Sequence, residues 1–344
     1  MMFDWYDIPL IIVFVFLTLY LGSFNKWIAF SSCAAIIAFY VSEHVFQRKK
    51  MMTIRGKHVV VTGGSSGIGK CVAILAAEKG ANITIIARNV QNLEKAKDEI
   101  LQACENKDRQ KVEYLSLDIT ADYKAVEKAL ADLENVMGPI YMLVNCAGFA
   151  LASKIEDTSI ETLDAMMRTN FLGTYYCIKA VTPRMKTSKE GIIVLVSSQA
   201  GLLGIFGYTA YCSTKFALRG LAESLVMELK PHGISVTLSL PPDTDTPGYA
   251  IEELSKPIET KAIEQMAKLN QPEDIAEKIL TDALAGNFFS TVGVESFVTA
   301  TLCAGMSPVQ SVRQLLTQVF LMGPFRLIGV GLLAYFDSVI AKYL

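Results

Sequence analysis

The sequence contains few of the residues that metal sites and disulfide frameworks need. Only three histidines occur in the 344 residues, and the seven cysteines are scattered, with no C-x-x-C pair among them. An odd number of unclustered cysteines is typical of a reduced, metal-free protein. We therefore expect no bound metal and no disulfide framework.

The chain also lacks a block of positive charge. Lys and Arg together number 32 against 34 Asp and Glu, which gives a formal net charge of −2. Proteins that bind nucleic acid gather Lys and Arg into patches that neutralise phosphates. The sequence therefore argues against a nucleic-acid partner.

Apolar residues, by contrast, are abundant, at 51% of the chain with a mean hydropathy of +0.35. Two apolar runs, 8–21 and 27–41, are each slightly shorter than the roughly 20 residues that span a bilayer. We predict that residues 1–50 form a membrane anchor, as one helix or as a hairpin, and a cleaved signal peptide is the alternative. Basic residues at 48–57 follow the second run, which places the rest of the chain on the cytoplasmic side.

The C-terminal segment is apolar too, but Arg326 and Asp337 interrupt the run at 320–344. A charge in the middle of a bilayer is costly. We therefore expect residues 291–344 to form an apolar helix that lies on the membrane or packs on the protein surface. An ordinary buried helix is the alternative.

Between these ends, short β-branched runs alternate with amphipathic stretches. The runs lie at 58–62, 82–87, 112–117, 141–145, 192–197 and 235–240. Strands that are apolar throughout and separated by helices are typical of a parallel sheet covered on both faces. The pattern predicts an α/β fold, a doubly wound parallel sheet of the Rossmann type, over residues 51–290.

The first predicted strand leads directly into a glycine-rich loop, "TGGSSGIGK", and then into a helix. Glycines at this point let the backbone approach a pyrophosphate at the helix N-terminus. The arrangement predicts a dinucleotide site, with an ordinary turn as the alternative. The loop residues expected to bind are Gly63, Ser65, Ser66, Gly67, Ile68 and Gly69.

The end of the second predicted strand indicates which nucleotide is bound. Ala87 stands where a carboxylate would bind the ribose of NAD, and Arg88 follows it. The planar guanidinium of arginine suits the oxygens of a 2′-phosphate. We predict NADPH as the cofactor, and the alternative is that Arg88 is a solvated surface residue.

Taken together, "TGGSSGIG", Asp118, "NCAG" at 145–148, Asn170, Ser198 and "YCSTK" at 211–215 resemble the short-chain dehydrogenase/reductase family in order and spacing. The resemblance covers roughly two thirds of the chain. It implies a general acid/base at Tyr211, a partner at Lys215 that lowers its pKa and binds ribose, a carbonyl-orienting Ser198, and a water relay through Asn170. For the cofactor it implies contacts from Asp118, Asn145, Ala147, Gly148, Tyr211, Lys215, Thr244 and Thr246.

The chemistry of ketone reduction agrees with these roles. Residues four apart share one face of a helix, so Tyr211 and Lys215 can form one site, where an ammonium would lower the pKa of the phenol. Ser198 would stabilise charge on the substrate oxygen. Each residue alone has a structural alternative: Ser198 as a strand-end cap, Asn170 as a helix-interior hydrogen bonder and Lys215 as a solvated side chain.

The substrate end is less defined. The thirty or so residues around 243–270 predict a lid, because long excursions in compact domains are usually functional. The apolar residues Leu202, Leu203, Ile205 and Phe206 precede Tyr211 and suit a long acyl chain, with core packing or a dimer contact as the alternative. One departure from the family pattern is Pro242, which replaces the usual glycine and removes an N–H donor.

The anchor and the stretch around Tyr211 resemble members of the family that reduce a long-chain lipid ketone with NADPH at the endoplasmic reticulum membrane. This resemblance implies a lipid substrate and a catalytic domain that faces the cytoplasm. Two alternatives are a membrane reductase of another lipophilic carbonyl, such as a 3-ketoacyl-CoA, steroid or retinoid, and a non-catalytic NADP(H)-binding membrane protein. A homo-oligomer is also possible.

Overall fold

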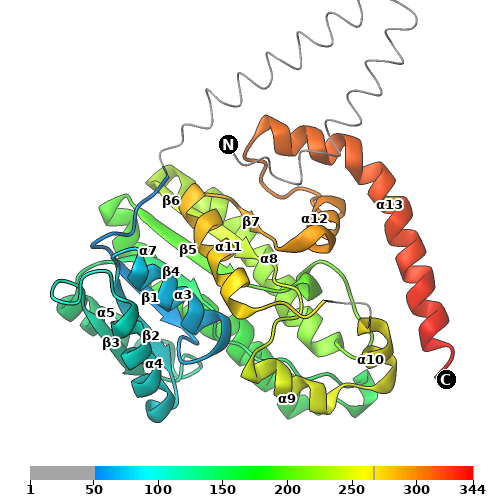
Figure 1. Cartoon of the computed structure of the whole chain (residues 1–344), viewed down its shortest axis with the longest axis horizontal. Helices are drawn as coiled ribbons and strands as arrows, with labels where there is room; N and C mark the ends of the chain where they lie inside the picture. The colour runs from blue at the N-terminus through cyan, green and yellow to red at the C-terminus, as the bar shows by residue number, and fades with distance from the viewer. Residues whose placement is uncertain (1–50, 266–267, 344) are drawn as a thin grey trace, which may run out of the picture.

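A seven-stranded parallel sheet forms the centre of the computed structural model, which describes residues 51–265 and 268–343 (Figure 1). The strand order is β3-β2-β1-β4-β5-β6-β7. The strands are β1 (His58–Thr62), β2 (Asn82–Ala87), β3 (Val112–Ser116), β4 (Ile140–Asn145), β5 (Gly191–Val196), β6 (Ile234–Ser239) and β7 (Phe289–Ser290). The predicted α/β fold with a doubly wound sheet is confirmed, and the predicted anchor at 1–50 lies outside the described residues.

The six predicted strands are all present, each within one residue of its predicted bounds. They are apolar throughout because both faces of the sheet are buried. Within β1, Val59 and Val61 belong to one core cluster and Val60 to the other, as the two-residue period of a strand requires. The two-residue β7 was not predicted, since it is too short to carry a pattern.

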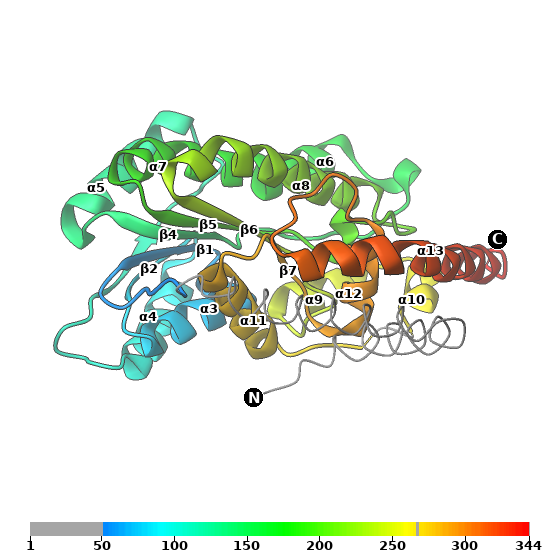
Figure 2. The same cartoon turned by 90° about the horizontal axis from the view of Figure 1, so that it is seen from above.

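Helices cover both faces of the sheet, as the view from above shows (Figure 2). One layer contains α3 (Gly67–Glu78), α4 (Val90–Ala103) and α11 (Pro272–Ala285), and the other contains α5 (Tyr123–Met137), α7 (Thr174–Ser188) and α8 (Thr209–Leu229). Short 3-10 turns lie at Ile155–Asp157, Gln199–Gly201 and Lys230–His232. Each layer encloses its own buried core.

The amphipathic stretch that follows β4 is not one regular helix. It divides into α6 (Ile160–Met166), a π-helical segment at Met167–Gly173 and then α7. A π-helical turn changes the direction in which side chains project and is frequent at functional sites. Here it contains Asn170, which is buried.

The predicted lid contains two helices, α9 (Pro247–Ser255) and α10 (Ile258–Glu264), between β6 and α11. Thr246 caps α9 by accepting a hydrogen bond from the Tyr249 N–H at 3.1 Å. Ala262 and Ile263 of α10 form a small buried cluster with Val339, near the C-terminus of the chain. The lid is therefore packed against the C-terminal helix.

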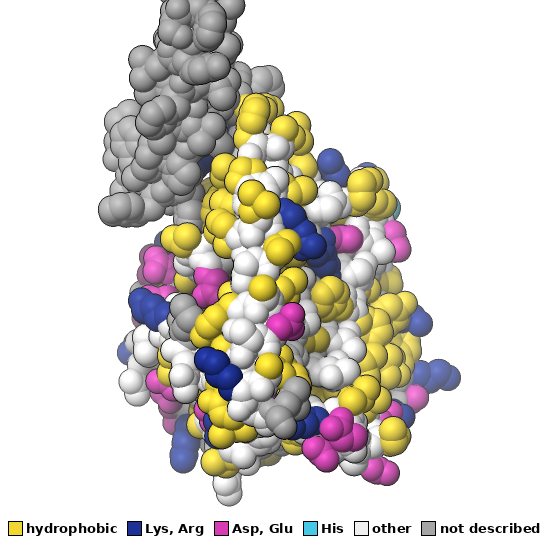
Figure 3. Space-filling model, turned by 90° about the vertical axis from the view of Figure 1, so that its right-hand side faces the viewer, with side chains coloured by type: hydrophobic (Ala, Val, Ile, Leu, Met, Phe, Trp, Pro, Cys, Tyr) yellow, Lys and Arg dark blue, Asp and Glu magenta, His cyan; other side chains and the backbone are white. Residues whose placement is uncertain are grey.

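The C-terminal segment forms α12 (Gly293–Leu302) and the 29-residue α13 (Val312–Ile340). Only Leu321 and Val339 of α13 are buried, so the alternative of an ordinary buried helix is wrong. Apolar side chains follow its exposed surface (Figure 3). Its length and composition make α13 a candidate membrane span, despite Arg326 and Asp337.

Candidate active site

The glycine-rich loop lies at the carboxyl end of β1, against the loop that follows β4. The Thr62 hydroxyl accepts hydrogen bonds from the N–H groups of Cys146 and Ala147, at 3.2 and 3.3 Å. Gly63 has a φ of +68°, and a Cβ there would lie 2.8 Å from the Ala147 Cα. A Cβ on Gly69 would lie 2.5 Å from the Gly63 carbonyl oxygen. Side chains are therefore excluded at both positions.

The N-terminus of α3 is open to a ligand. Ser66 occupies the N-cap position, but its side chain makes no capping hydrogen bond. Unsatisfied N–H groups and the helix dipole favour an anion at such an end. Gly67 has a φ of +52°, and a Cβ there would lie 3.0 Å from Thr246, which places Thr246 beside the loop. These features fit a dinucleotide pyrophosphate.

The other residues of the loop take different positions. Ser65 is half-buried, and Ser66 is exposed. Ile68 packs against the core between the sheet and α3. Its side chain therefore holds the loop in place, and only its backbone remains as a group that a cofactor can bind.

Arg88 and Asp118 lie beyond the carboxyl ends of β2 and β3, and both are exposed. Asp118 Oδ1 accepts hydrogen bonds from the Thr120 N–H and hydroxyl, at 2.9 and 2.8 Å. These bonds, with a smaller contribution from the charge of Arg88, hold the pKa of Asp118 below its usual value. The structure therefore brings Arg88 and Asp118 together at the edge where the adenosine end of a dinucleotide would lie.

Asn145 ends β4 and is buried. Its Nδ2 donates to the Val194 carbonyl at 3.1 Å and so ties β4 to β5. Its Oδ1 has no hydrogen-bond partner among residues 51–265 and 268–343. Gly148, three residues on, is exposed at the site, and a Cβ there would lie 3.7 Å from Lys215 Nζ.

Asn170 holds the loop after β4 in place. Its Oδ1 accepts from the Phe149 N–H at 2.9 Å, and its Nδ2 donates to the Phe149 carbonyl at 2.9 Å and to the Thr214 hydroxyl at 3.0 Å. All three bonds are local protein contacts, and they connect the π-helical segment to α8. The structure thus gives Asn170 a structural role, and the water relay stays a prediction.

Tyr211 and Lys215 share one face of α8, as predicted. The Lys215 Nζ lies 5.5 Å from the centroid of the Tyr211 ring and donates to the Val196 carbonyl at 3.0 Å. Ser198 lies two residues beyond the end of β5. Its side chain interacts with that of Tyr211, and its hydroxyl accepts from the Ala200 N–H at 3.2 Å. The structure therefore brings Tyr211, Lys215 and Ser198 into one site.

The electrostatics of this group differ from the prediction. Burial and, next, the charge of Glu252 raise the pKa of Tyr211, although the hydrogen bond with Ser198 opposes them. Burial lowers the pKa of Lys215 to about 8. Loss of water is the largest cause of the pKa shift of each group. Tyr211 is therefore protonated at neutral pH, in the form that can donate a proton to an alkoxide.

The residues predicted to accompany the site are only partly brought to it. Thr244 is buried, and its hydroxyl donates to the Pro242 carbonyl at 2.8 Å. Leu202 is buried in the core between the sheet and the layer of α5, α7 and α8, so the core-packing alternative is right for this residue. Ile205 instead packs beside Tyr211. Phe206 packs in the cluster of α10 and α13.

Three polar partners of the site were not singled out from the sequence. They are Thr62, Thr214 and Ser197, whose hydroxyl donates to the Lys215 carbonyl at 3.0 Å. Thr214 lies inside "YCSTK", and Thr62 and Ser197 lie at strand ends, so the sequence contains a positional signal for each. That signal cannot distinguish them from ordinary polar residues in turns.

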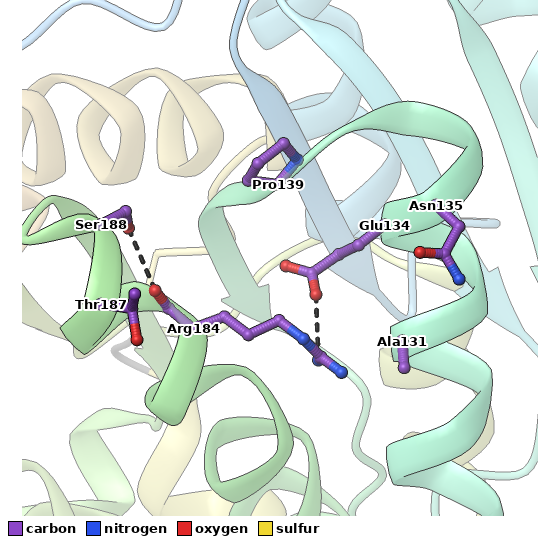
Figure 4. Close-up of a pocket in the computed structure, with 7 residues that line it drawn as sticks. All are labelled: Ala131, Glu134, Asn135, Pro139, Arg184, Thr187 and Ser188. Atoms are coloured by element: carbon purple, nitrogen blue, oxygen red, sulfur yellow. Dashed lines mark hydrogen bonds and ion pairs between the residues drawn. The ribbon is translucent and has the colours of Figure 1, made fainter.

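A cavity of about 520 Å³ lies elsewhere, between α5 and α7 (Figure 4). Arg184 and Glu134 form an ion pair of 2.9 Å across it. Pro139, also in its wall, precedes β4, so this cavity is at the amino end of the sheet, whereas ligands of open α/β sheets bind at the carboxyl end. We therefore assign it no role in the site.

A glycine loop against a helix N-terminus, with a tyrosine, a lysine and a serine at the same sheet edge, defines a nicotinamide-dependent oxidoreductase. Residues 57–253 match the family model described as short chain dehydrogenase. The chain belongs to this family.

The relatives are similar over most of their length. The chain is 46% identical over 314 residues to "3-ketodihydrosphingosine reductase" of Bos taurus, covering 90% of this chain and 94% of the relative. It is 38% identical over 295 residues to the protein of the same name in Dictyostelium discoideum, covering 82% and 87%.

Solved structures agree on the fold. Levodione reductase has a TM-score of 0.63 at 22% identity, covering 72% of this chain and 99% of that one. NAD⁺-bound xylitol dehydrogenase has a TM-score of 0.61 at 22% identity, covering 70% and 98%.

We predict that Gly63→Ala will weaken binding of the nicotinamide cofactor roughly 10-fold or more, because the new Cβ forces the loop away from Ala147 and overpacking costs about 1–3 kcal/mol. Fluorescence titration of the reduced cofactor measures this. Gly138→Ala is the matched control: Gly138 also has a positive φ, but a Cβ there meets nothing within 4 Å. Equal loss of affinity in both variants would show that backbone strain alone, and not the close approach, is responsible.

Proposed function

We propose that this protein reduces 3-ketosphinganine to sphinganine with NADPH, a step of sphingolipid synthesis. One observation carries the proposal: Tyr211, Lys215 and Ser198 meet at the carboxyl edge of the sheet in a chain 46% identical over 90% of its length to a 3-ketodihydrosphingosine reductase. We infer the substrate from the names of the relatives, and we infer ketone reduction from the residues of the site.

Different residues of this chain bind the cofactor, hydrogen-bond to the ketone oxygen and donate the proton. NADPH, when bound along the loop at 63–69, supplies the hydride. Ser198 donates a hydrogen bond to the ketone oxygen, and Tyr211 gives its proton to the oxygen as negative charge develops. The Lys215 ammonium stabilises the tyrosinate that remains. Asn170 fixes the loop that borders this site.

The choice of NADPH rests on Arg88. It lies at the carboxyl end of β2, is exposed, and has no carboxylate immediately before it, since Ala87 precedes it. A guanidinium in this position can form paired hydrogen bonds with a 2′-phosphate.

The apolar ends support a membrane enzyme. We propose that residues 1–50 anchor the protein, that 51–290 are the catalytic domain, and that 291–344 associate with the membrane through α13. The basic residues at 48–57 favour a catalytic domain that faces the cytoplasm. The endoplasmic reticulum is the membrane we propose, because the resemblance to reductases of a long-chain lipid ketone implies it.

The substrate is tested by incubating the purified full-length protein with NADPH and one carbonyl at a time, while the absorbance of the reduced nicotinamide is followed. We expect turnover with 3-ketosphinganine. Turnover only with a 3-ketoacyl-CoA, a steroid ketone or a retinal would contradict the proposed substrate. NADPH binding without turnover of any carbonyl would favour a non-catalytic protein.

We predict that Tyr211→Phe lowers kcat by about 10²- to 10⁴-fold, the usual contribution of a general acid, and leaves NADPH affinity unchanged. Single-turnover kinetics and a binding titration separate the two effects. Tyr175→Phe is the control, because Tyr175 is an exposed tyrosine on α7. A Tyr211→Phe protein with a near-normal rate would exclude Tyr211 as the proton donor.

We predict that Arg88→Asp weakens NADPH binding roughly 10- to 100-fold, because the variant loses a charge-assisted bond and repels the 2′-phosphate. NADH binding should not weaken. The ratio of the two affinities is the measurement, and Arg109→Asp, at an exposed arginine before β3, is the control. An unchanged preference for NADPH would remove Arg88 from the site.

A further inference from the structure

The lid holds an unusual group of buried charges. The Lys256 side chain is fully buried, directly after α9. Its Nζ lies 2.7 Å from Glu264 Oε2 and 3.6 Å from Glu252 Oε1, and it also contacts Glu253. Three carboxylates therefore share one ammonium.

This group has more acid than base. Asp243, on the loop after β6, adds a fourth carboxyl group that feels the charge of Lys256. Burial raises the pKa values of Asp243 and Glu252, and that of Glu264 to about 7, because the carboxylates are desolvated with too few cations nearby. An additional positive charge at this place would stabilise the ionised forms.

Glu252 is the member of this group that acts most strongly on the candidate catalytic residues, and Asp243 has a smaller effect on Tyr211. Tyr208, which is buried, donates its hydroxyl hydrogen to Glu252 Oε1, and the ring of Tyr208 lies 5.7 Å from that of Tyr211. The charge of Glu252 acts on the pKa of both Tyr211 and Lys215, whereas that of Glu253 is not among the causes of either shift. Glu252 is thus electrostatically coupled to the reacting centre.

Glu252 also keeps one oxygen available. Within the described part of the chain, the hydrogen bond from Tyr208 and the close approach of Lys256 both involve Oε1, and no hydrogen bond to Oε2 is found. The side chain is 15% exposed, so it is neither sealed in the core nor fully solvated. A carboxylate held by one oxygen can bind a donor with the other.

The proposed substrate brings a matching charge. Ketosphinganine is an amino ketone: the carbon next to its carbonyl carries an amino group, which is protonated as an ammonium. With the carbonyl oxygen at Tyr211 and Ser198, the substrate ammonium would lie only a few bonds from that oxygen. It would then be close to the ammonium of Lys215, and the site would contain two cations. Two cations in a desolvated site repel each other strongly, so an ionised carboxylate is needed nearby.

We infer that the Glu252 carboxylate binds the ammonium group of the substrate and so selects amino ketones over lipid ketones that lack the amine. The inference rests on the proposed function, because it concerns the same site and substrate. It identifies Glu252 as a specificity-determining residue, with Tyr208 and Lys256 as the groups that position its carboxylate.

The test compares two pairs of ligands that differ only in the amine. Steady-state kinetics use ketosphinganine and the same long-chain hydroxy ketone without the amino group. Equilibrium binding uses sphinganine and the corresponding long-chain diol. For Glu252→Gln we expect the preference for the amine-bearing member of each pair to fall on the order of 10- to 100-fold, as for loss of a charge-assisted hydrogen bond. Glu252→Gln should reduce the ketone without an amine, and bind the diol without an amine, at least as well as the wild type does.

Two variants serve as controls. Glu253→Gln removes another carboxylate from the same lysine, on the same helix, and should leave the preference for the amine unchanged. Glu252→Asp keeps the charge and should retain part of the preference. Melting temperature and NADPH affinity of each variant establish that the fold is intact.

The outcomes separate the two proposals. If Glu252→Gln lowers activity and binding equally with and without the amine, or keeps the wild-type preference, Glu252 does not bind the ammonium. If Glu252→Gln does not fold, the same comparison is made with Glu252→Asp and with the wild type. A wild-type protein with no preference for the amine-bearing ligands overturns the inference. If the wild type reduces neither ketone, the proposed function fails, while the binding pair still tests Glu252.

Discussion

The catalytic end of the molecule depends on one buried ammonium. Lys215 donates to the Val196 carbonyl at the end of β5, and the Ser197 hydroxyl donates to the Lys215 carbonyl. These two bonds run in opposite directions between the strand and α8, so they fix the helix against the sheet. Because Ser198 follows the same strand and Tyr211 lies one turn before Lys215, the proposed hydrogen-bond donor Ser198 and the proposed proton donor Tyr211 are held in place together.

A buried cation also constrains what surrounds it. Burial lowers the pKa of Lys215, and the interactions with Cys146 and Glu252 act against that decrease. Burial raises the pKa of Tyr211, and the charge of the same carboxylate adds to this increase. The predicted lid therefore contributes to the charge balance of the site through Glu252, and a cationic substrate would alter that balance directly.

The sequence predicts the sheet well, and it places the candidate catalytic residues at one edge of that sheet, because both depend on local patterns; the roles of these residues stay predictions. Apolar runs define the strands, and short motifs at strand ends define Gly63, Ser198, Tyr211 and Lys215. It could not predict the π-helical turn that contains Asn170, since this segment contacts α8, which lies more than thirty residues further along the chain. The pKa direction of Tyr211 was wrong for a similar reason: spacing places Lys215 near, but burial depends on the whole fold.

The two helices of the predicted lid carry both charged and apolar side chains, and these contact different parts of the molecule. Helix α9 and the residue after it carry Glu252 and Lys256, next to Tyr208 and the catalytic tyrosine. Helix α10 ends with Glu264, which belongs to the same charged group, and it also places Ala262 and Ile263 against Val339 of α13, where Phe206 packs too. A polar end thus faces the reacting centre and an apolar end faces the long exposed helix. This is the division that a lipid with a charged head and a long hydrocarbon chain requires, because each part is then bound by groups of matching polarity.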